Sequence, residues 1–97
     1  NRKNFLAYKV VNGKKSQYAV GARSMSNGFH RGTIAHYYPN TTKKDTKGLG
    51  YFLHYKKPYA GGYNLIRVVV LKGAKIREAT EYDKGREFTA DHIFVVG

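Results

Sequence analysis

The chain has 97 residues, which is enough for one small domain with a modest core and too few for two lobes. Its 18 Lys and Arg against 6 Asp and Glu give a formal net charge of +12, which favours a polyanionic partner, most of all RNA. Cysteine is absent, so disulfides and thiolate metal ligands are excluded. No apolar run approaches the roughly 20 residues that span a bilayer, so no membrane span is predicted.

The positive charge is concentrated in the first four fifths of the chain. Up to Arg77 there are 16 Lys or Arg and one acid, Asp45, which gives 16 − 1 = +15; the remaining residues hold 2 Lys or Arg against 5 acids. The chain begins without an initiator Met or an apolar signal core, and we interpret residues 1–97 as a single monomeric domain from a longer protein.

The first predicted strand is Phe5 to Val11, which is rich in aromatic and β-branched residues. Asn12-Gly13 follows it and is typical of a type I′ hairpin turn. Ser16 to Ala22 is therefore predicted to pair with the first strand, and the small, polar stretch Arg23 to Gly28 is predicted to be a loop.

The middle of the chain alternates between strands and basic segments. Phe29 to Tyr38 is predicted as one strand that Pro39-Asn40 ends, and Thr41 to Gly50 as an exposed basic loop. Further strands are predicted at Tyr51 to Tyr55, Tyr63 to Lys72, Lys75 to Thr80 and His92 to Val96.

The most apolar of these segments, Tyr63 to Lys72, is expected to be the central strand. Tyr82 to Arg86 is expected to be a charged turn, and only the first few residues and Lys57 to Ala60 are open to helix. The fold class predicted is mainly β or α+β: a single small domain with a twisted antiparallel sheet and little helix.

Histidine is the side chain whose unperturbed pKa, about 6.5, allows it to act as acid or base near neutrality. Cleaving RNA without a metal needs a base for the 2′-hydroxyl, an acid for the leaving 5′-oxygen and a cation beside the phosphorane. The chain offers His30, His36, His54 and His92.

A catalytic pair has to come from different predicted strands. His30 and His36 lie six residues apart, roughly 20 Å along a straight strand. Either of them with His54, or with His92, satisfies the requirement, and the residues leave this choice open.

The densest local group of chemically active side chains is His30, Arg31 and Thr33, in a segment that also contains Gly28 and Gly32. It offers a base, a bidentate phosphate ligand and a hydroxyl next to backbone that a ligand can approach. The residues predicted to be catalytic are therefore His30, Arg31, Thr33, His54 and His92.

Cations interleaved with aromatic rings are typical of grooves that bind nucleic acid, because phosphates pair with the cations and bases stack on the rings. The residues predicted to bind RNA, from tRNA or rRNA, are Lys43, Lys44, Lys47, Tyr51, Lys56 and Lys57. No metal site and no cofactor is predicted, because no compact group of His and acids appears outside the acidic tail. A non-enzymatic RNA- or DNA-binding module is the alternative without chemistry.

The chain resembles, in its basic composition, size and lack of cysteine, the C-terminal ribonuclease toxin domains of colicins and contact-dependent inhibition toxins, in the barnase/EndoU/RelE-like group. Gly28-Phe29-His30 and the segment Asp91 to Gly97 are similar to two EndoU strings, in the reverse of the eukaryotic order. The resemblance implies His30 and His92 as catalytic histidines with a lysine. It also implies cleavage to a 2′,3′-cyclic phosphate, an acidic immunity protein, and delivery from a bacterium into the cytoplasm of a target cell.

A second resemblance concerns another class of enzyme. Phe29 to Thr33, then Gly48 to Phe52, then Val68 to Gly73 and a late acid look like the order of motifs in ADP-ribosyltransferases. In that family an Arg or His and a Tyr hold NAD, and an acid orients the ribose. The resemblance implies Glu87 or Asp91 as the acid, and an ADP-ribosyltransferase or NAD-consuming toxin domain is the alternative function.

Overall fold

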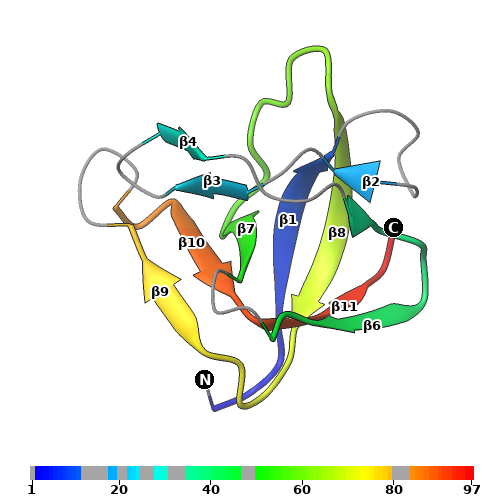
Figure 1. Ribbon diagram of the computed structural model, residues 1–97, viewed down its shortest axis with the longest axis vertical. Coiled ribbons are helices and arrows are strands. Elements are labelled where there is room, and N and C mark those ends of the chain that lie inside the picture. Colours follow the sequence, from blue (N-terminus) through cyan, green and yellow to red (C-terminus); the bar gives the residue numbers. More distant parts are fainter. Residues whose placement is uncertain are drawn as a thin grey trace.

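A computed structural model describes residues 2–11, 18–19, 22–24, 28–30, 35–46, 50–79 and 84–97, and between residues 18 and 35 it describes the backbone alone. The strands of the main sheet are β1 (Phe5–Val11), β6 (Thr41–Lys44), β7 (Tyr51–His54), β8 (Asn64–Val70), β9 (Ile76–Glu78), β10 (Glu87–Ala90) and β11 (His92–Val95). Two short pairs of strands lie outside it, β2 (Tyr18–Ala19) with β5 (Ala35–His36) and β3 (Ala22–Ser24) with β4 (Gly28–His30). All pairings in the described residues are antiparallel (Figure 1).

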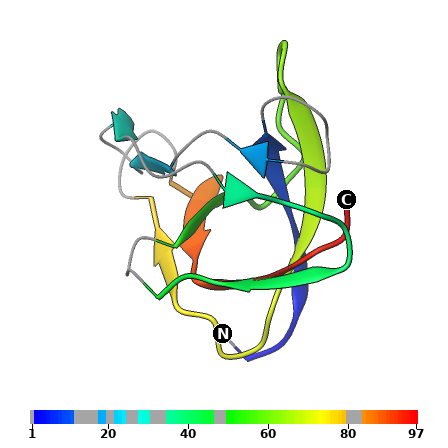
Figure 2. The same cartoon turned by 45° about the vertical axis from the view of Figure 1, so that its right-hand side comes forward.

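The main sheet has the order β6-β11-β8-β1-β7-β10-β9 and curls on itself. β10 and β11 occupy distant places in this order, yet a single residue, Asp91, joins them. The sheet therefore has to bend until its two halves meet at Asp91, and Figure 2 shows the resulting open barrel. Right-handed strand twist makes such coiling the favoured shape of a small sheet.

The core fills the inside of this curl because alternate residues of each strand point inward. On β8 the fully buried residues are Ile66, Val68 and Val70, and Arg67 between them is exposed. Fully buried side chains from the other strands complete the core: Val11, Leu53, Phe88, Ile93 and Val95. At about 25 cal/mol per Å² of buried apolar area, this one cluster is the main stabilising term of the domain.

The predicted fold class is confirmed: the domain is mainly β, its main sheet is antiparallel and the described residues contain no helix. Predicted strands at Phe5 to Val11, Tyr51 to Tyr55 and Tyr63 to Lys72 are confirmed within a residue or two. β8 lies inside the sheet with partners on both sides, as its apolar sequence predicted.

The predicted hairpin partner of the first strand is wrong. β1 pairs along its full length with β8 and at Tyr8 with His54 of β7, so both of its edges are used by strands distant in the chain. The strand at Tyr18–Ala19 pairs with β5 instead. Asn12-Gly13, the turn signal, lies outside the described residues. The burial that β1 gains between β8 and β7 therefore decides its pairing, and the preference of Asn12-Gly13 for a hairpin turn does not.

The segment Phe29 to Tyr38 is not one strand. Its two ends belong to different small sheets, since His30 pairs with Ala22 on β3 and His36 pairs with Tyr18 on β2. The separation of about 20 Å expected for His30 and His36 on one straight strand therefore does not apply.

Two further strands correct the sequence interpretation. Thr41–Lys44 was predicted to be a loop but forms the edge strand β6, in which Lys44 is exposed, as is common at sheet edges, and Lys43 is half-buried. The predicted loop at Arg23 to Gly28 contains the last two residues of β3, Arg23 and Ser24, and the first residue of β4, Gly28. β10 was not predicted, because Glu87-Phe88-Thr89-Ala90 has only one large apolar side chain although all four residues are buried.

Candidate functional site

A histidine and a glutamate face each other across two neighbouring strands on the outer side of the sheet. His54 on β7 is directly opposite Glu87 on β10, and Nδ1 of the histidine lies 3.7 Å from Oε2 of the glutamate. The side chains are 15% and 6% exposed. A carboxylate this deeply buried needs a charged or hydrogen-bonding neighbour, and the imidazole supplies one.

The alternation of the two strands explains why this pair points away from the core. Leu53 and Phe88 are also directly opposite each other, one residue along each strand, and both are fully buried inside the barrel. Successive side chains of a strand point to opposite faces, so His54 and Glu87 are held on the outer face by the burial of their neighbours.

Two more polar side chains continue this pair into a row across four strands. Tyr8 on β1 is opposite His54 on one side and opposite Arg67 of β8 on the other. The row therefore runs Arg67, Tyr8, His54, Glu87 across β8, β1, β7 and β10. Directly opposed residues lie about 4.5–5.5 Å apart at their Cβ atoms, so these four side chains form a continuous polar line.

A cavity of about 480 Å³ opens above the pair. Lys56, Lys57 and Arg86 line it together with Tyr59, His54 and Glu87. All three cations are exposed, whereas the carboxylate is buried, so the mouth of this candidate catalytic pocket is positive and one acid lies at its base. Such a distribution attracts an anionic group to the rim and leaves the acid beside the bound molecule.

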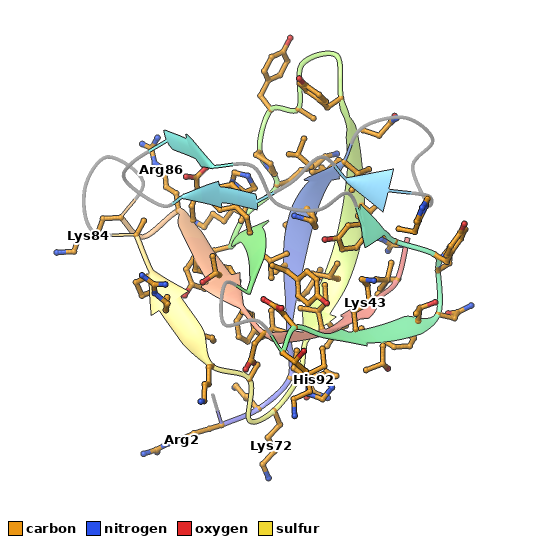
Figure 3. All side chains as sticks on the ribbon, viewed as in Figure 1. Arg2, Lys43, Lys72, Lys84, Arg86 and His92 are labelled. Carbon is orange, nitrogen blue, oxygen red and sulfur yellow. The ribbon has the colours of Figure 1, made fainter. Side chains whose placement is uncertain are left out.

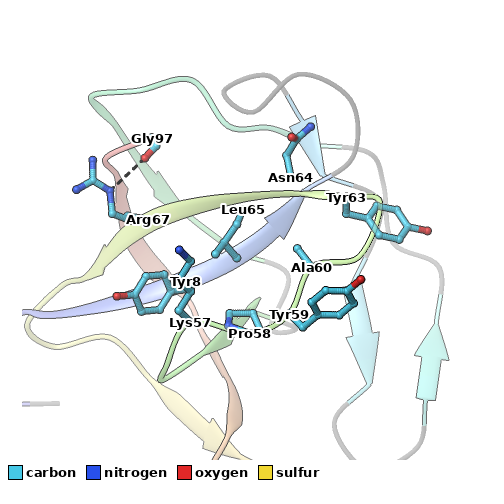
Figure 4. A pocket seen from close by; sticks show the side chains of 10 residues that line it. All are labelled: Tyr8, Lys57, Pro58, Tyr59, Ala60, Tyr63, Asn64, Leu65, Arg67 and Gly97. Atoms are coloured by element: carbon cyan, nitrogen blue, oxygen red, sulfur yellow. Dashed lines mark hydrogen bonds between the residues drawn. The ribbon is translucent and has the colours of Figure 1, made fainter.

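A second hollow of about 610 Å³ adjoins the candidate catalytic pocket, and Figure 4 shows its side chains. The two share Lys57, Pro58 and Tyr59 of the connection between β7 and β8. Tyr8 and Arg67, the other half of the polar row, lie in this second hollow. The row therefore connects both hollows along one face of the sheet.

A separate group of titratable side chains lies on the inner side of the sheet. Lys9 is buried, donates a hydrogen bond to the carbonyl of Phe52 at 2.9 Å, and has its Nζ 5.4 Å from the ring centre of Tyr37. Lys43 Nζ lies 5.2 Å from the same ring and 6.0 Å from that of Tyr51. Burial lowers the pKa of Lys9 to about 8.

The two tyrosines of this inner group are shifted in the opposite direction. Burial, followed by charge on Tyr51 and Asp45, raises the pKa of the Tyr37 phenol, and burial followed by Asp45 raises that of Tyr51. Both phenols therefore stay protonated at neutral pH, and the rings act as neutral partners for the two ammonium groups.

The predicted catalytic residues are not all brought together. His54 is in the candidate catalytic pocket, whereas His92 on β11 is directly opposite Lys44 on β6. Figure 3 shows the labelled Arg86 at the upper left of the view and His92 near the bottom. The backbone of His30 belongs to the β3–β4 pair, and β3 contacts β7. Arg31 and Thr33 lie outside the described residues.

The residues predicted to bind RNA also divide into groups. Lys56 and Lys57 line the candidate catalytic pocket. Lys44 is exposed on the edge strand β6. Lys43 and Tyr51 belong to the inner group around Tyr37, and Lys47 lies outside the described residues.

Sequence reasoning left three residues of this face unassigned: Tyr8, Arg67 and Arg86. Glu87 entered only through the resemblance to ADP-ribosyltransferases. The signal available for Tyr8 and Arg67 was alternation, because each is a polar residue between inward-facing apolar ones on a long strand. Which strands are neighbours, and hence that the two residues meet, is not a local property.

Among the described residues there is no group of three His, Asp or Glu side chains placed to hold a metal ion. Within the same residues no helix has the length and hydropathy needed to cross a membrane. Comparisons of the chain with protein-family models, with curated proteins and with solved structures found no match.

Proposed function

We propose that the catalytic pocket cleaves the N-glycosidic bond of NAD and transfers ADP-ribose to an acceptor. The observation that carries the proposal is the burial of Glu87 against His54 at the base of a cation-lined pocket. Glu87 is one of the two acids implied by the resemblance to ADP-ribosyltransferases. Asp91, the other, accepts a hydrogen bond from the backbone N–H of Lys75 and does not line this pocket.

The chemistry of NAD suits a site with one carboxylate. Nicotinamide leaves as a neutral molecule because its ring nitrogen is already cationic, so no acid is needed to protonate it. The C1′–N bond breaks with its electron pair remaining on nicotinamide, and the carboxylate of Glu87 stabilises the positive charge that develops at C1′. An acceptor hydroxyl or amine then bonds to C1′ and gives its proton to Glu87.

The other pocket residues have parts in the same reaction. Lys56, Lys57 and Arg86 at the rim are placed to neutralise the pyrophosphate of NAD. Tyr59 offers a ring on which a base or nicotinamide stacks. His54 fixes the orientation of the Glu87 carboxylate, which makes it a positioning residue in this scheme.

The test is release of nicotinamide from NAD by the purified domain, followed by chromatography, with RNA and protein acceptors supplied in separate reactions. We expect Glu87→Gln to lower the rate at least about 100-fold while circular dichroism stays unchanged. Glu78→Gln is the matched control, because Glu78 is on the adjacent strand β9 and accepts a hydrogen bond from the Tyr55 hydroxyl outside the pocket. Equal activity of wild type and Glu87→Gln would exclude this role for Glu87.

The second candidate is a metal-independent endoribonuclease, and the formal net charge of +12 favours it. In this scheme Glu87 takes the 2′-hydroxyl proton, the 2′-oxygen attacks phosphorus, and His54 protonates the departing 5′-oxygen. The products are a 2′,3′-cyclic phosphate and a free 5′-hydroxyl, and Arg86 stabilises the phosphorane. As a toxin domain it would act on tRNA or rRNA in a target cell and be neutralised by an acidic immunity protein.

The two schemes separate in one set of reactions. Total RNA incubated with the domain and EDTA is examined on a gel, beside His54→Ala, His30→Ala and His92→Ala. Cleavage by wild type that His54→Ala abolishes supports the ribonuclease scheme, and intact RNA together with nicotinamide release supports the NAD scheme. If the folded domain leaves both substrates unchanged, both schemes are wrong and the non-enzymatic binding module stands.

A further inference from the structure

The hollow beside the catalytic pocket is built by the connection between β7 and β8, which folds over the outer face of β1 and β8 (Figure 4). A tight turn holds this connection, in which the N–H of Tyr63 donates to the carbonyl of Ala60 at 3.0 Å. Gly61 adopts a φ of +61° in this turn, a value that favours glycine. The turn sets Tyr59 and Tyr63 on its two sides.

Both of these tyrosine rings are directed to solvent rather than to the core. Tyr59 is 96% exposed and Tyr63 is 57% exposed, although large aromatic side chains normally bury most of their surface. Tyr8 and Leu65 add half-buried apolar surface below them. The hollow thus offers rings with open faces above an apolar base.

The charge around these rings has one sign. Lys57 and Arg67 line the hollow and are exposed, and no Asp or Glu side chain is among its described lining residues. Arg67 is held in place by a hydrogen bond from Nε to the carbonyl of Gly97 at 3.3 Å. Open aromatic faces beside exposed cations suit a single strand of nucleic acid, because its bases stack on the rings and its phosphates pair with the cations.

We propose that this hollow, lined by Tyr8, Lys57, Tyr59, Tyr63, Leu65 and Arg67, binds a segment of single-stranded nucleic acid. Because Lys57, Pro58 and Tyr59 also belong to the catalytic pocket, a strand in the hollow extends directly toward His54 and Glu87. The bound strand is then the acceptor of ADP-ribose. That last step rests on the proposed function, whereas the binding itself does not.

The binding test is fluorescence anisotropy with labelled oligo(U) and oligo(dT) of about 12 nucleotides, and with a duplex of the same length. We expect the double variant Tyr59→Ala with Tyr63→Ala to bind both single strands at least about 5-fold more weakly, since stacking of each base is lost. The double Phe variant keeps the rings and should bind like wild type. Tyr38→Ala is the matched control, because Tyr38 is 54% exposed but does not line the hollow.

The contribution of positive charge to binding is tested with Arg67→Gln. Removing one phosphate contact should lower the slope of log affinity against log salt by about 0.7. Lys72→Gln removes an equally exposed cation elsewhere and should leave affinity less affected than Arg67→Gln does. Tighter binding of oligo(U) than of oligo(dT), or the reverse, shows which kind of single strand the hollow prefers.

The proposal is overturned if the double Ala variant binds as wild type does, if Tyr38→Ala loses as much affinity, or if duplex binds more tightly than single strands. All of these binding measurements are made without NAD. Binding of the oligonucleotide with no nicotinamide release leaves the binding proposal intact and rejects the NAD scheme. Nicotinamide release with no oligonucleotide binding supports the NAD scheme and rejects the binding proposal.

Discussion

His54 and Glu87 are directly opposite each other on β7 and β10, with 3.7 Å between Nδ1 and Oε2. β7 also contacts β1 through the single described register pair Tyr8–His54, whereas β1 and β8 share seven such pairs. The histidine therefore stands where the sheet is least continuous. Lys9 bridges the same place from the inner side by its hydrogen bond to Phe52.

The first prediction concerns the histidines. His54→Gln should lower the turnover of whichever substrate the domain uses, NAD or RNA, about 100-fold or more. The reason is that the side chain that orients or assists Glu87 is lost. His92→Gln should stay within about 2-fold of wild type, since His92 is paired with Lys44 on the other half of the sheet. Steady-state kinetics on both variants checks this. If His92→Gln lost more turnover than His54→Gln, the catalytic centre would lie at β11 and not at β7.

The second prediction concerns the buried amine of Lys9 and the pH dependence of stability. The pKa of this amine is about 8 in the folded domain, compared with an ordinary value of 10.5. As pH rises, the folded domain therefore releases this proton at a lower pH than the unfolded chain does. Below about pH 8 both folded and unfolded chains are protonated and the cost of burying the charge is fully present. Between about pH 8 and 10.5 that cost is progressively relieved.

The free energy of unfolding of wild type, relative to Lys9→Met, should thus rise by about 2 kcal/mol between about pH 7.5 and about pH 9.5. Urea denaturation of both proteins at the two pH values measures it. The two proteins are compared only up to about pH 9.5, because tyrosine phenols begin to ionise near pH 10 in the unfolded chain. A difference that is constant with pH would show that the amine is solvated.

The third prediction concerns Gly50, the residue that precedes β7. Its φ is +76°, its N–H donates to Oδ2 of Asp45 at 2.5 Å, and an added Cβ would lie 3.1 Å from Cβ of Thr89 and 3.2 Å from the carbonyl oxygen of Ala90. Gly50→Ala should therefore lower the free energy of unfolding by about 1–3 kcal/mol. Gly62→Ala, at a position with open space around it, is the control in the same urea titrations. Equal stability of the two variants would contradict the strain argument.

The fourth prediction concerns Phe88, whose ring is fully buried beneath the pocket and stacks on Tyr55 with 4.0 Å between ring centres. Phe88→Ala should destabilise the domain by about 3–5 kcal/mol through lost burial and the cavity left behind. If Phe88→Ala is unfolded in water, Phe88→Leu can be measured instead, because it removes less of the side chain and should lower the free energy of unfolding by less. A change below about 1 kcal/mol for Phe88→Ala would mean that the ring is not part of the core.

Several features of this protein were predictable from local sequence. The strands β1, β7 and β8 are marked by runs of aromatic and β-branched residues, and the apolar run of β8 indicates its place inside the sheet. The cationic surface and the absence of disulfides follow from composition alone. These are properties of single segments or of the whole composition, so no partner has to be known.

Other features depended on pairing between distant strands. β10 has little apolar sequence and becomes buried only because it lies between β7 and β9, and β6 is a strand only because β11 pairs with it. The site shows the same dependence. His54 was predicted as catalytic, but the other members of its polar row, Glu87, Tyr8 and Arg67, lie 33, 46 and 13 positions away in the chain.

The sequence by itself determined the β class, the positive charge and the types of side chain available for chemistry, because these depend on composition and on alternation along one strand. The tertiary structure decided which of them meet. The sheet closes at Asp91, and the register of β8, β1, β7 and β10 then brings one arginine, one tyrosine, one histidine and one buried glutamate into a single line. Register is set by burial of the whole inner face, which no local segment encodes.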